Sequence, residues 1–168
     1  MKELIDDIKT RIEPVTGLKY VDEDWGQLDY YSGGPPVKFP CALVDIGQVQ
    51  WSDNGNQVQI GTGSVIIRIA DQRISNSNVK APVAQKTKSL SFFDLIMYIH
   101  QKLHGWSGAK NNGPLTRVAY KKVKRDDGIR EVEMIYAVEI TDDSARKIYG
   151  KKRILAAGIK VTVERKTS

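Results

Sequence analysis

Two short turn signals constrain the fold of this chain more than any other feature of its sequence. Asn54-Gly55 and Asp127-Gly128 each stand between runs in which apolar and polar residues alternate. Both dipeptides favour the type I′ turn that joins two antiparallel strands, because both central residues of that turn have positive φ. We therefore expect two β-hairpins.

The turn of the first hairpin implies a register. With Asn54 and Gly55 as the two central residues, the facing pairs are Trp51 with Val58, Gln50 with Gln59, Val49 with Ile60 and Gly47 with Thr62. The apolar alternation changes phase at Gly47 and within residues 61–63, and glycines there favour a bulge or a sharp bend. We expect a long, bent hairpin whose tip projects beyond the core, with Gln50, Gln57 and Gln59 on one face.

The second hairpin has one strand with a clear core face, because apolar and polar residues alternate along it. Its apolar residues are Val132, Met134, Tyr136, Val138 and Ile140. A two-residue turn at Asp127-Gly128 implies the facing pairs Val123 with Val132, Lys122 with Glu133, and Lys124 with Glu131. Basic residues 121–125 could contact nucleic acid, but facing glutamates are more typical of a solvated, charge-paired surface.

Two segments have the apolar spacing of amphipathic helices. The first ends at Pro14, and its apolar residues are Leu4, Ile5, Ile8, Ile12 and Val15. The second is expected to begin with Ser91 as N-cap and Asp94 three residues on, and to end at Gly105. Its stripe comprises Phe92, Phe93, Ile96, Ile99, His100 and Leu103. Residues 20–40 and 74–88 are expected to be loops.

This order of elements predicts the fold class. Strands that cluster in hairpins, without alternating with helices, imply an antiparallel sheet. The predicted fold is α+β, with a sheet built from two hairpins and two main helices packed on one face. Residues 1–150 are expected to form one domain. Residues 151–168 form a basic C-terminal segment, in which 158–164 alternate as an added strand would and the end is frayed.

Charge is distributed unevenly along the chain. The net charge is +6 over 168 residues, yet residues 1–50 contain five Lys/Arg and nine Asp/Glu. Residues 151–168, in contrast, contain six Lys/Arg and one Glu. A basic end is compatible with nucleic-acid binding. It is equally compatible with head-to-tail contacts between an acidic and a basic surface of identical subunits.

His100 and His104 are one helical turn apart, as in a helical zinc site. Gln101 stands where a zinc protease has its catalytic glutamate, so histidines at the core or its edge are the better interpretation. Residues 61–64, GTGS, lack the Gly-Lys-Ser/Thr ending of a phosphate-binding loop. No catalytic, metal-binding or cofactor-binding residue is assigned.

Cys41 is the only cysteine, which excludes an intramolecular disulfide and suits a reducing compartment. It is expected to be a buried thiol, and the acidic residues 22–24 are expected to be solvated. The N-terminal sequence MKELIDDIKT has acids where a secretory signal has an apolar run. No run approaches the roughly 18 apolar residues that span a membrane.

The layout resembles a known family. The segments FPCALVDI, QIGTGSVIIRIADQ, LSFFDLIMYIHQKLHG and PLTRVAYKKVKRDDGIREVEMIYAVEI follow an amphipathic helix and an aromatic, proline-containing loop. In order and pattern they resemble the tail-terminator or tail-completion (minor tail) proteins of bacteriophages and prophages, over residues 3–141.

The resemblance implies a structural protein of virion assembly, with no enzyme activity and no cofactor. It implies a homo-oligomeric ring, usually of six subunits, that caps the tail tube and joins it to head-completion proteins. The implied locations are the host bacterial cytoplasm during assembly and the virion tail. A basic nucleic-acid-binding module is the first alternative, and an enzyme with scattered site residues is the second.

The residues themselves suggest where subunits would meet. Glutamine side chains donate and accept hydrogen bonds without burying charge, which suits a protein contact. The predicted interface residues are Gln50, Trp51, Asn54, Gln57 and Gln59 of the hairpin, Tyr30 and Tyr31 of the long loop, and Lys151, Lys152 and Arg153 as charged contacts. Contact with DNA through the basic end would be non-specific.

Overall fold

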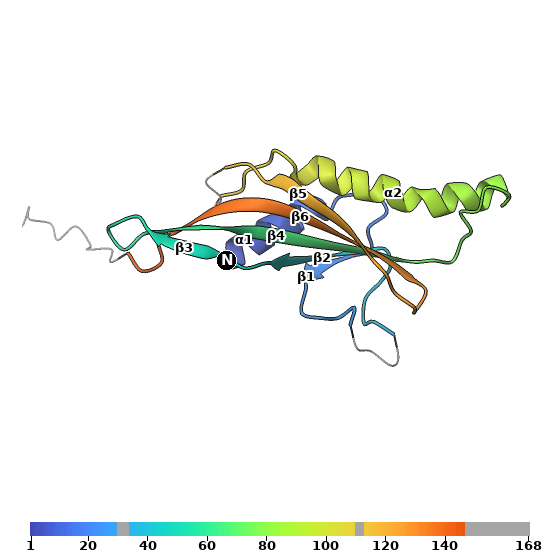
Figure 1. Cartoon of the computed structure of the whole chain (residues 1–168), viewed down its shortest axis with the longest axis horizontal. Helices are drawn as coiled ribbons and strands as arrows, with labels where there is room; N and C mark the ends of the chain where they lie inside the picture. The colour runs from blue at the N-terminus through green and yellow to red at the C-terminus, as the bar shows by residue number, and fades with distance from the viewer. Residues whose placement is uncertain (30–33, 110–112, 147–168) are drawn as a thin grey trace, which may run out of the picture.

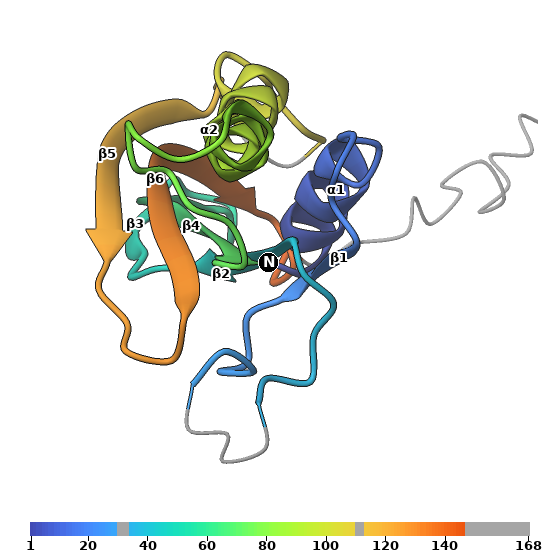
Figure 2. The same cartoon turned by 90° about the vertical axis from the view of Figure 1, so that its right-hand side faces the viewer.

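The computed structural model describes residues 1–29, 34–109 and 113–146. Its elements follow the order α1 (Lys2–Ile12), β1 (Tyr20–Glu23), β2 (Cys41–Ile46), β3 (Gln50–Asp53), β4 (Gln59–Gln72), α2 (Val83–Leu103), β5 (Thr116–Val123) and β6 (Ile129–Asp142). The strands form one sheet in the order β1-β2-β4-β6-β5, and β3 also pairs with β4. Both helices lie on one face of the sheet (Figure 1, Figure 2). The predicted α+β class is confirmed.

Strands β4 and β6 form the centre of the sheet. Each has 14 residues, and they pair along their whole length from Gln59 opposite Asp142 to Gln72 opposite Ile129. Alternate residues of both strands face the helices and are buried, which confirms the predicted core face of β6. These residues are Val65, Ile67, Ile69, Val132, Met134, Tyr136, Val138 and Ile140.

The two helices complete this core. The buried residues of α1 are Leu4, Ile8 and Ile12, as its apolar spacing predicts. The buried apolar residues of α2 are Phe92, Leu95, Ile96, Ile99 and Leu103. Among the described residues, no helix combines the length and the apolar character needed to cross a bilayer.

The predicted start of α2 was wrong. The helix begins at Val83, after Pro82, whose extended backbone precedes the first turn. Ser91 lies inside the helix, where its hydroxyl donates to the carbonyl oxygen of Lys88 at 2.8 Å. Residues 84–88 include the good helix formers Ala, Gln and Lys, but they are mostly exposed and lack an apolar stripe. Hydrophobic spacing therefore could not reveal this turn of helix.

Strand β1 lies in a segment that was predicted to be a loop. It pairs in parallel with β2, from Tyr20 opposite Cys41 to Glu23 opposite Val44. The sheet is therefore mixed, with one parallel pair at its edge. Four residues are too few for a visible alternation, so the sequence pattern could not identify this strand.

The predicted bend in the first hairpin is confirmed. Strand β2 ends with Ile46 opposite Val65, and β3 begins with Gln50 opposite Thr62. The three residues 47–49 therefore stand opposite only two residues, 63–64. The extra residue makes this a β-bulge. Glycine is needed here, because a Cβ on Gly63 would lie 2.8 Å from the carbonyl oxygen of Gln48.

The predicted two-residue turn of this hairpin was wrong. The loop comprises residues 54–58, and the N–H of Asn54 donates to the carbonyl oxygen of Val58 at 2.9 Å. Gly55, Asn56 and Gln57 have φ of 78°, 54° and 61°. Three consecutive left-handed residues make a wider turn than Asn-Gly alone would, so the register is shifted.

The shift changes which side chains share a face. Trp51 faces Gly61 and Gln50 faces Thr62, so Trp51 and Gln59 lie on the helix side whereas Gln50 lies on the opposite side. The expected face shared by Gln50 and Gln59 is therefore incorrect.

The second hairpin is offset by one residue from its predicted register. Lys121 faces Glu133, Lys122 faces Val132 and Val123 faces Glu131. In the turn, Gly128 has φ of 76° but Asp127 does not have positive φ, so the turn is not type I′. A shift of one residue moves every side chain of β5 to the other face. The predicted charge pairs of Lys122 and Lys124 are therefore wrong.

Candidate subunit interface

The tip of the β3–β4 hairpin lies at one end of the long axis of the molecule (Figure 1). All four residues of β3 are exposed, as are residues 54–57 of the loop. Trp51 is only 40% exposed, because its indole lies across Gly61, where a Cβ would be 2.7 Å from the ring. Trp51 therefore packs on its own strand partner and also presents apolar surface at the tip.

The structure brings together half of the predicted interface residues. Those on the hairpin are all exposed, namely Gln50, Trp51, Asn54, Gln57 and Gln59. Because Gln50 and Gln59 point to opposite faces, a single partner surface on one face of the hairpin cannot contact both. Tyr30, Tyr31, Lys151, Lys152 and Arg153 lie outside the described residues, as do residues 147–168 as a whole.

A second apolar surface was not recognised in the sequence. We call it the α2–β5 surface and define it as Leu90, Phe93 and Met97 of α2 with Val118 and Tyr120 of β5. These side chains are 45–61% exposed: Leu90 51%, Phe93 54%, Met97 45%, Val118 61% and Tyr120 49%. The spacing of Leu90, Phe93 and Met97 is itself helical, and a helix that is apolar on two faces needs two partners. This second apolar stripe was the signal in the sequence that could have predicted the surface.

The two parts of the α2–β5 surface adjoin each other. The backbone N–H of Arg117, in β5, donates to Nδ1 of His104 at the end of α2, at 3.2 Å. Phe93 and Met97 lie seven residues before His100 and His104, hence on the same line of the helix. Tyr120 faces Met134, whose side chain points to the helix side of the sheet. The helix and the edge strand thus form one exposed strip.

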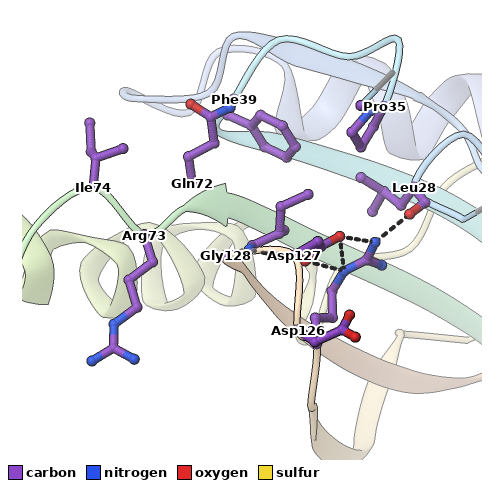
Figure 3. A pocket seen from close by; sticks show the side chains of 12 residues that line it. Leu28, Pro35, Phe39, Gln72, Arg73, Ile74, Asp126, Asp127 and Gly128 are labelled. Atoms are coloured by element: carbon purple, nitrogen blue, oxygen red, sulfur yellow. Dashed lines mark hydrogen bonds and ion pairs between the residues drawn. The ribbon is translucent and has the colours of Figure 1, made fainter. Parts of the chain in front are cut away.

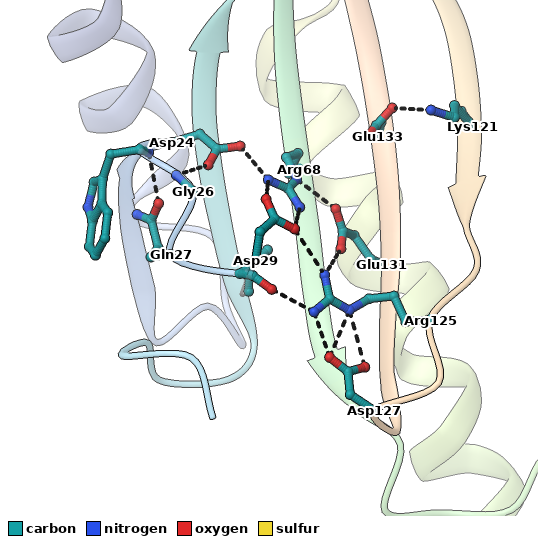
Figure 4. Close-up of polar contacts among 12 residues, drawn as sticks. Asp24, Gly26, Gln27, Asp29, Arg68, Lys121, Arg125, Asp127, Glu131 and Glu133 are labelled. Carbon is teal, nitrogen blue, oxygen red and sulfur yellow. Dashed lines mark hydrogen bonds and ion pairs between the residues drawn. The ribbon is translucent and has the colours of Figure 1, made fainter. Parts of the chain in front are cut away.

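The opposite face of the sheet carries a network of ion pairs (Figure 4). Arg68, in β4, contacts Asp24 at 2.9 Å, Asp29 at 2.9 Å and Glu131 at 2.6 Å. Arg125 contacts Glu131 at 2.8 Å and Asp127 at 2.6 Å. The side chain of Glu131 has no exposed surface. Asp24, predicted to be solvated, is instead a buried partner with 8% of its side chain exposed.

The network fixes the segment that follows β1 against the sheet. Asp24 and Asp29 come from that segment, and Arg125 also donates to the carbonyl oxygen of Leu28 at 2.6 Å. Hydrogen bonds from Arg68 lower the pKa of Asp29 although burial opposes this. Hydrogen bonds from Arg125 lower the pKa of Asp127 in the same way. Each of these carboxylates is engaged in an ion pair with Arg68 or Arg125, so the arrangement is a structural one.

A pocket of about 780 Å³ lies beside this network (Figure 3). Its apolar lining includes Leu28, Phe39 and Ile129, and its charged lining includes Arg73 and Asp126. The Arg125–Asp127 ion pair forms part of its wall (Figure 3).

The histidine pair and the cysteine have structural surroundings. The rings of His100 and His104 are 5.0 Å apart between centroids. Nδ1 of His100 lies 3.1 Å from the hydroxyl of Tyr136, and Nδ1 of His104 accepts from β5. Burial lowers the pKa of His100, so the neutral ring is favoured. Within the described ranges, no group of three or more His, Cys, Asp or Glu residues could hold a metal ion.

The prediction for Cys41 is confirmed. The residue is fully buried in a small second core with Leu28, Leu43 and Ala70. Burial raises the pKa of its thiol to about 12, and the thiolate is the reactive form of cysteine. Cys41 is therefore a packing residue of the face that the network covers.

Comparison with known proteins finds similarity among solved structures. No protein-family profile matches the chain, and no curated protein sequence matches it. Among solved structures, a chain described as "Virion of native gene transfer agent (GTA) particle" aligns with a TM-score of 0.53 at 10% sequence identity. The alignment covers 84% of this chain and 96% of that one.

The likeness extends over almost the whole of the virion chain, so the two proteins share a complete fold and not a fragment of one. At 10% identity the shared property is the fold alone. The chain described here has the α+β fold of a component of a gene transfer agent virion.

Proposed function

We propose that this protein is a structural assembly protein of a phage or phage-like tail. It forms a ring that caps the tail tube and connects the tail to head-completion proteins. The observation that carries the proposal is the fold shared with nearly the full length of a virion chain. The order of sequence segments that resembles tail-terminator proteins points independently to the same class.

The shape of the molecule supports an assembly role. A hairpin that reaches to one end of the long axis exposes all of β3 and most of its loop (Figure 1). The α2–β5 surface exposes five further large apolar side chains. Exposed apolar groups that lie together on a soluble protein mark contact sites. The α2–β5 surface and the hairpin tip, which exposes Trp51 among polar residues, suit a subunit that touches both its own copies and other virion proteins.

The titratable groups of the described residues give less support to catalysis. The pKa values of the ion-paired Asp29 and Asp127 are shifted toward the charged form, and those of Cys41 and His100 toward the neutral form. A catalytic site instead needs a group whose pKa is matched to proton transfer or nucleophilic attack. We therefore treat the protein as a non-enzymatic component.

The salt dependence of DNA binding distinguishes the nucleic-acid-binding alternative from the proposed function. Lys121 forms an ion pair with Glu133 and Arg125 is held by three carboxylates, so these cations are already neutralised within the chain. A protein that binds DNA through phosphates loses affinity steeply between 50 and 200 mM salt. We expect only weak binding to a DNA duplex of random sequence. Tight binding that falls steeply with salt would favour the alternative.

The proposed function can be tested by electron microscopy of assembled phage or phage-like particles. Removing the gene for this chain from the phage or phage-like element that encodes it should leave filled heads and unjoined, irregularly ended tails in electron micrographs. Supplying the chain in trans should restore joined particles. Normal particles in the absence of the chain would contradict the proposal, as would a defect confined to the head shell.

A further inference from the structure

The α2–β5 surface is apolar at its centre and basic at its rim. Its apolar centre, defined above, is formed by α2 and β5. The exposed cations beside it on β5 are Arg117 and Lys122, whose strand partners Tyr136 and Val132 point to the helix side of the sheet. Strand β5 is also the last strand at its side of the sheet. This side of the molecule therefore presents apolar groups, positive charge and a strand edge together.

The opposite side of the sheet presents a complementary set of groups. Strand β1 is the last strand there, and it carries Asp22 and the exposed Glu23. Trp25 lies two residues after the end of β1 and is 57% exposed, more than Trp51 at 40%. We define the β1 side as Asp22, Glu23 and Trp25. Figure 4 shows Asp24 beside β2 and Lys121 on β5, with the central strands between them.

We propose that the α2–β5 surface of one copy binds the β1 side of the next copy. This contact rests on the ring proposed above and names the surfaces that build it. Trp25 packs on the exposed side chains of Phe93, Met97 and Tyr120. The carboxylates of Asp22 and Glu23 face the cations of β5.

Charge and position favour a contact between unlike surfaces over one between like surfaces. Two α2–β5 surfaces facing each other would oppose Lys122 to its own copy, and like charges across an interface are unfavourable. Unlike surfaces at opposite edges of one sheet leave each subunit with one free side, so that the contact repeats and closes a ring when the rotation allows it. Aromatic residues that are exposed in the free subunit are the usual anchors of such contacts.

Two complementary variants test the contact. The first, Phe93→Asp with Met97→Asp, blocks the α2–β5 surface. The second, Glu23→Lys with Trp25→Ala, blocks the β1 side. Matched controls are Val79→Asp and Ile74→Ala, because both residues are highly exposed, at 85% and 72%, and belong to neither surface. Thermal melting of each full-length variant confirms that it is folded.

The readout is the mass of the particles in analytical ultracentrifugation. Wild type and both controls should associate, and each blocking variant alone should bind its own copies at least about 30-fold more weakly, the loss expected of an anchoring aromatic residue. A 1:1 mixture of the two blocking variants should form dimers and nothing larger, because each retains one intact side.

Three results would overturn the contact. Association of either folded blocking variant at wild-type strength would overturn it and leave the proposed ring in place. Blocking variants that fail to form dimers when mixed would show that the surfaces do not bind each other. Wild-type protein that remains monomeric at every concentration would remove the ring itself, and with it the contact.

Discussion

The guanidinium of Arg68 donates to the carboxylate of Glu131 at 2.6 Å, across neighbouring central strands of the sheet. Glu131 has no exposed side-chain surface and also accepts from Arg125. Two cations therefore compensate one buried anion on the face of the sheet opposite α1 and α2. The same cations hold the segment after β1 through Asp24 and Asp29.

Replacing Arg68 with methionine should destabilise the fold by about 3 kcal/mol, because removing one partner leaves buried charge without compensation. Chemical denaturation measures the loss. Lys121→Met is the matched control, since its ion pair with Glu133 is largely exposed and is expected to contribute less than about 1 kcal/mol. Equal effects of the two substitutions would show that the Arg68 network is not a buried one.

Stability should fall in acid. Asp29 and Asp127 have a lower pKa in the folded chain than the ordinary value of 3.8. The unfolded chain thus binds more protons, so the stabilisation is present above about pH 4 and is lost as pH falls through the lower folded pKa. The double variant Asp29→Asn with Asp127→Asn should flatten the pH dependence in this window. An unchanged slope would mean that these carboxylates titrate normally.

Gly61→Ala should destabilise the hairpin by about 1–3 kcal/mol, the usual cost of overpacking. The new methyl group would lie 2.7 Å from both the Trp51 ring and a methyl group of Val49. The indole must then move, and its NMR signal should shift. Gly113→Ala is the control, because nothing lies within 4 Å of a Cβ at that position. A Gly61→Ala variant as stable as this control would contradict the close packing.

Trp51→Ala should weaken binding to a partner more than it weakens folding. The exposed 40% of the side chain is available for contact, and a tryptophan anchor contributes at least about 2 kcal/mol to binding. The part packed on Gly61 contributes to stability, at about 1–2 kcal/mol for its buried apolar area. Trp51→Phe, which keeps a ring over Gly61, serves as control. Lost stability with unchanged association would make Trp51 a packing residue only.

Deleting residues 151–168 tests whether the positive charge of this segment, which lies outside the described residues, contributes to assembly. Six cations against one anion in this segment would steer one subunit toward the acidic side of the next, and salt would screen this effect. The truncated chain should stay folded and assemble more slowly, most clearly at low salt. Assembly that is unchanged at every salt concentration would remove the segment from the ring contact.

Residue patterns identified the elements with long periodicity. The β6 core face and the α1 stripe were predictable because each repeats over several residues, and all of these residues except the partly buried Ile5 are buried. The bulge was predictable because the apolar alternation along the first hairpin changes phase at Gly47. Strand β1 and the first turns of α2 were not predictable, since one is four residues long and the other has no apolar stripe.

Register was the weakest prediction. In the first hairpin the turn is wider than Asn-Gly implies, because Asn56 and Gln57 also adopt left-handed φ. In the second hairpin Asp127 does not adopt the positive φ that a type I′ turn requires. The Arg68 network joins positions far apart in sequence, and acidic residues 22–24 look solvated without their partner strand. The α2–β5 surface was missed because Phe93 was assigned to the core stripe of the helix and Leu90 and Met97 to no stripe, whereas the three are exposed and form a second stripe.

The mass of the full-length chain in solution tests the central claim most directly. Native mass spectrometry at increasing concentration should show one closed species of defined subunit number, with six copies of the 18.8 kDa chain as the number that the resemblance to tail-terminator proteins implies. Electron microscopy of that species should show a ring with a central opening. A chain that remains monomeric throughout, or that associates into open-ended polymers without a preferred number, would contradict the account.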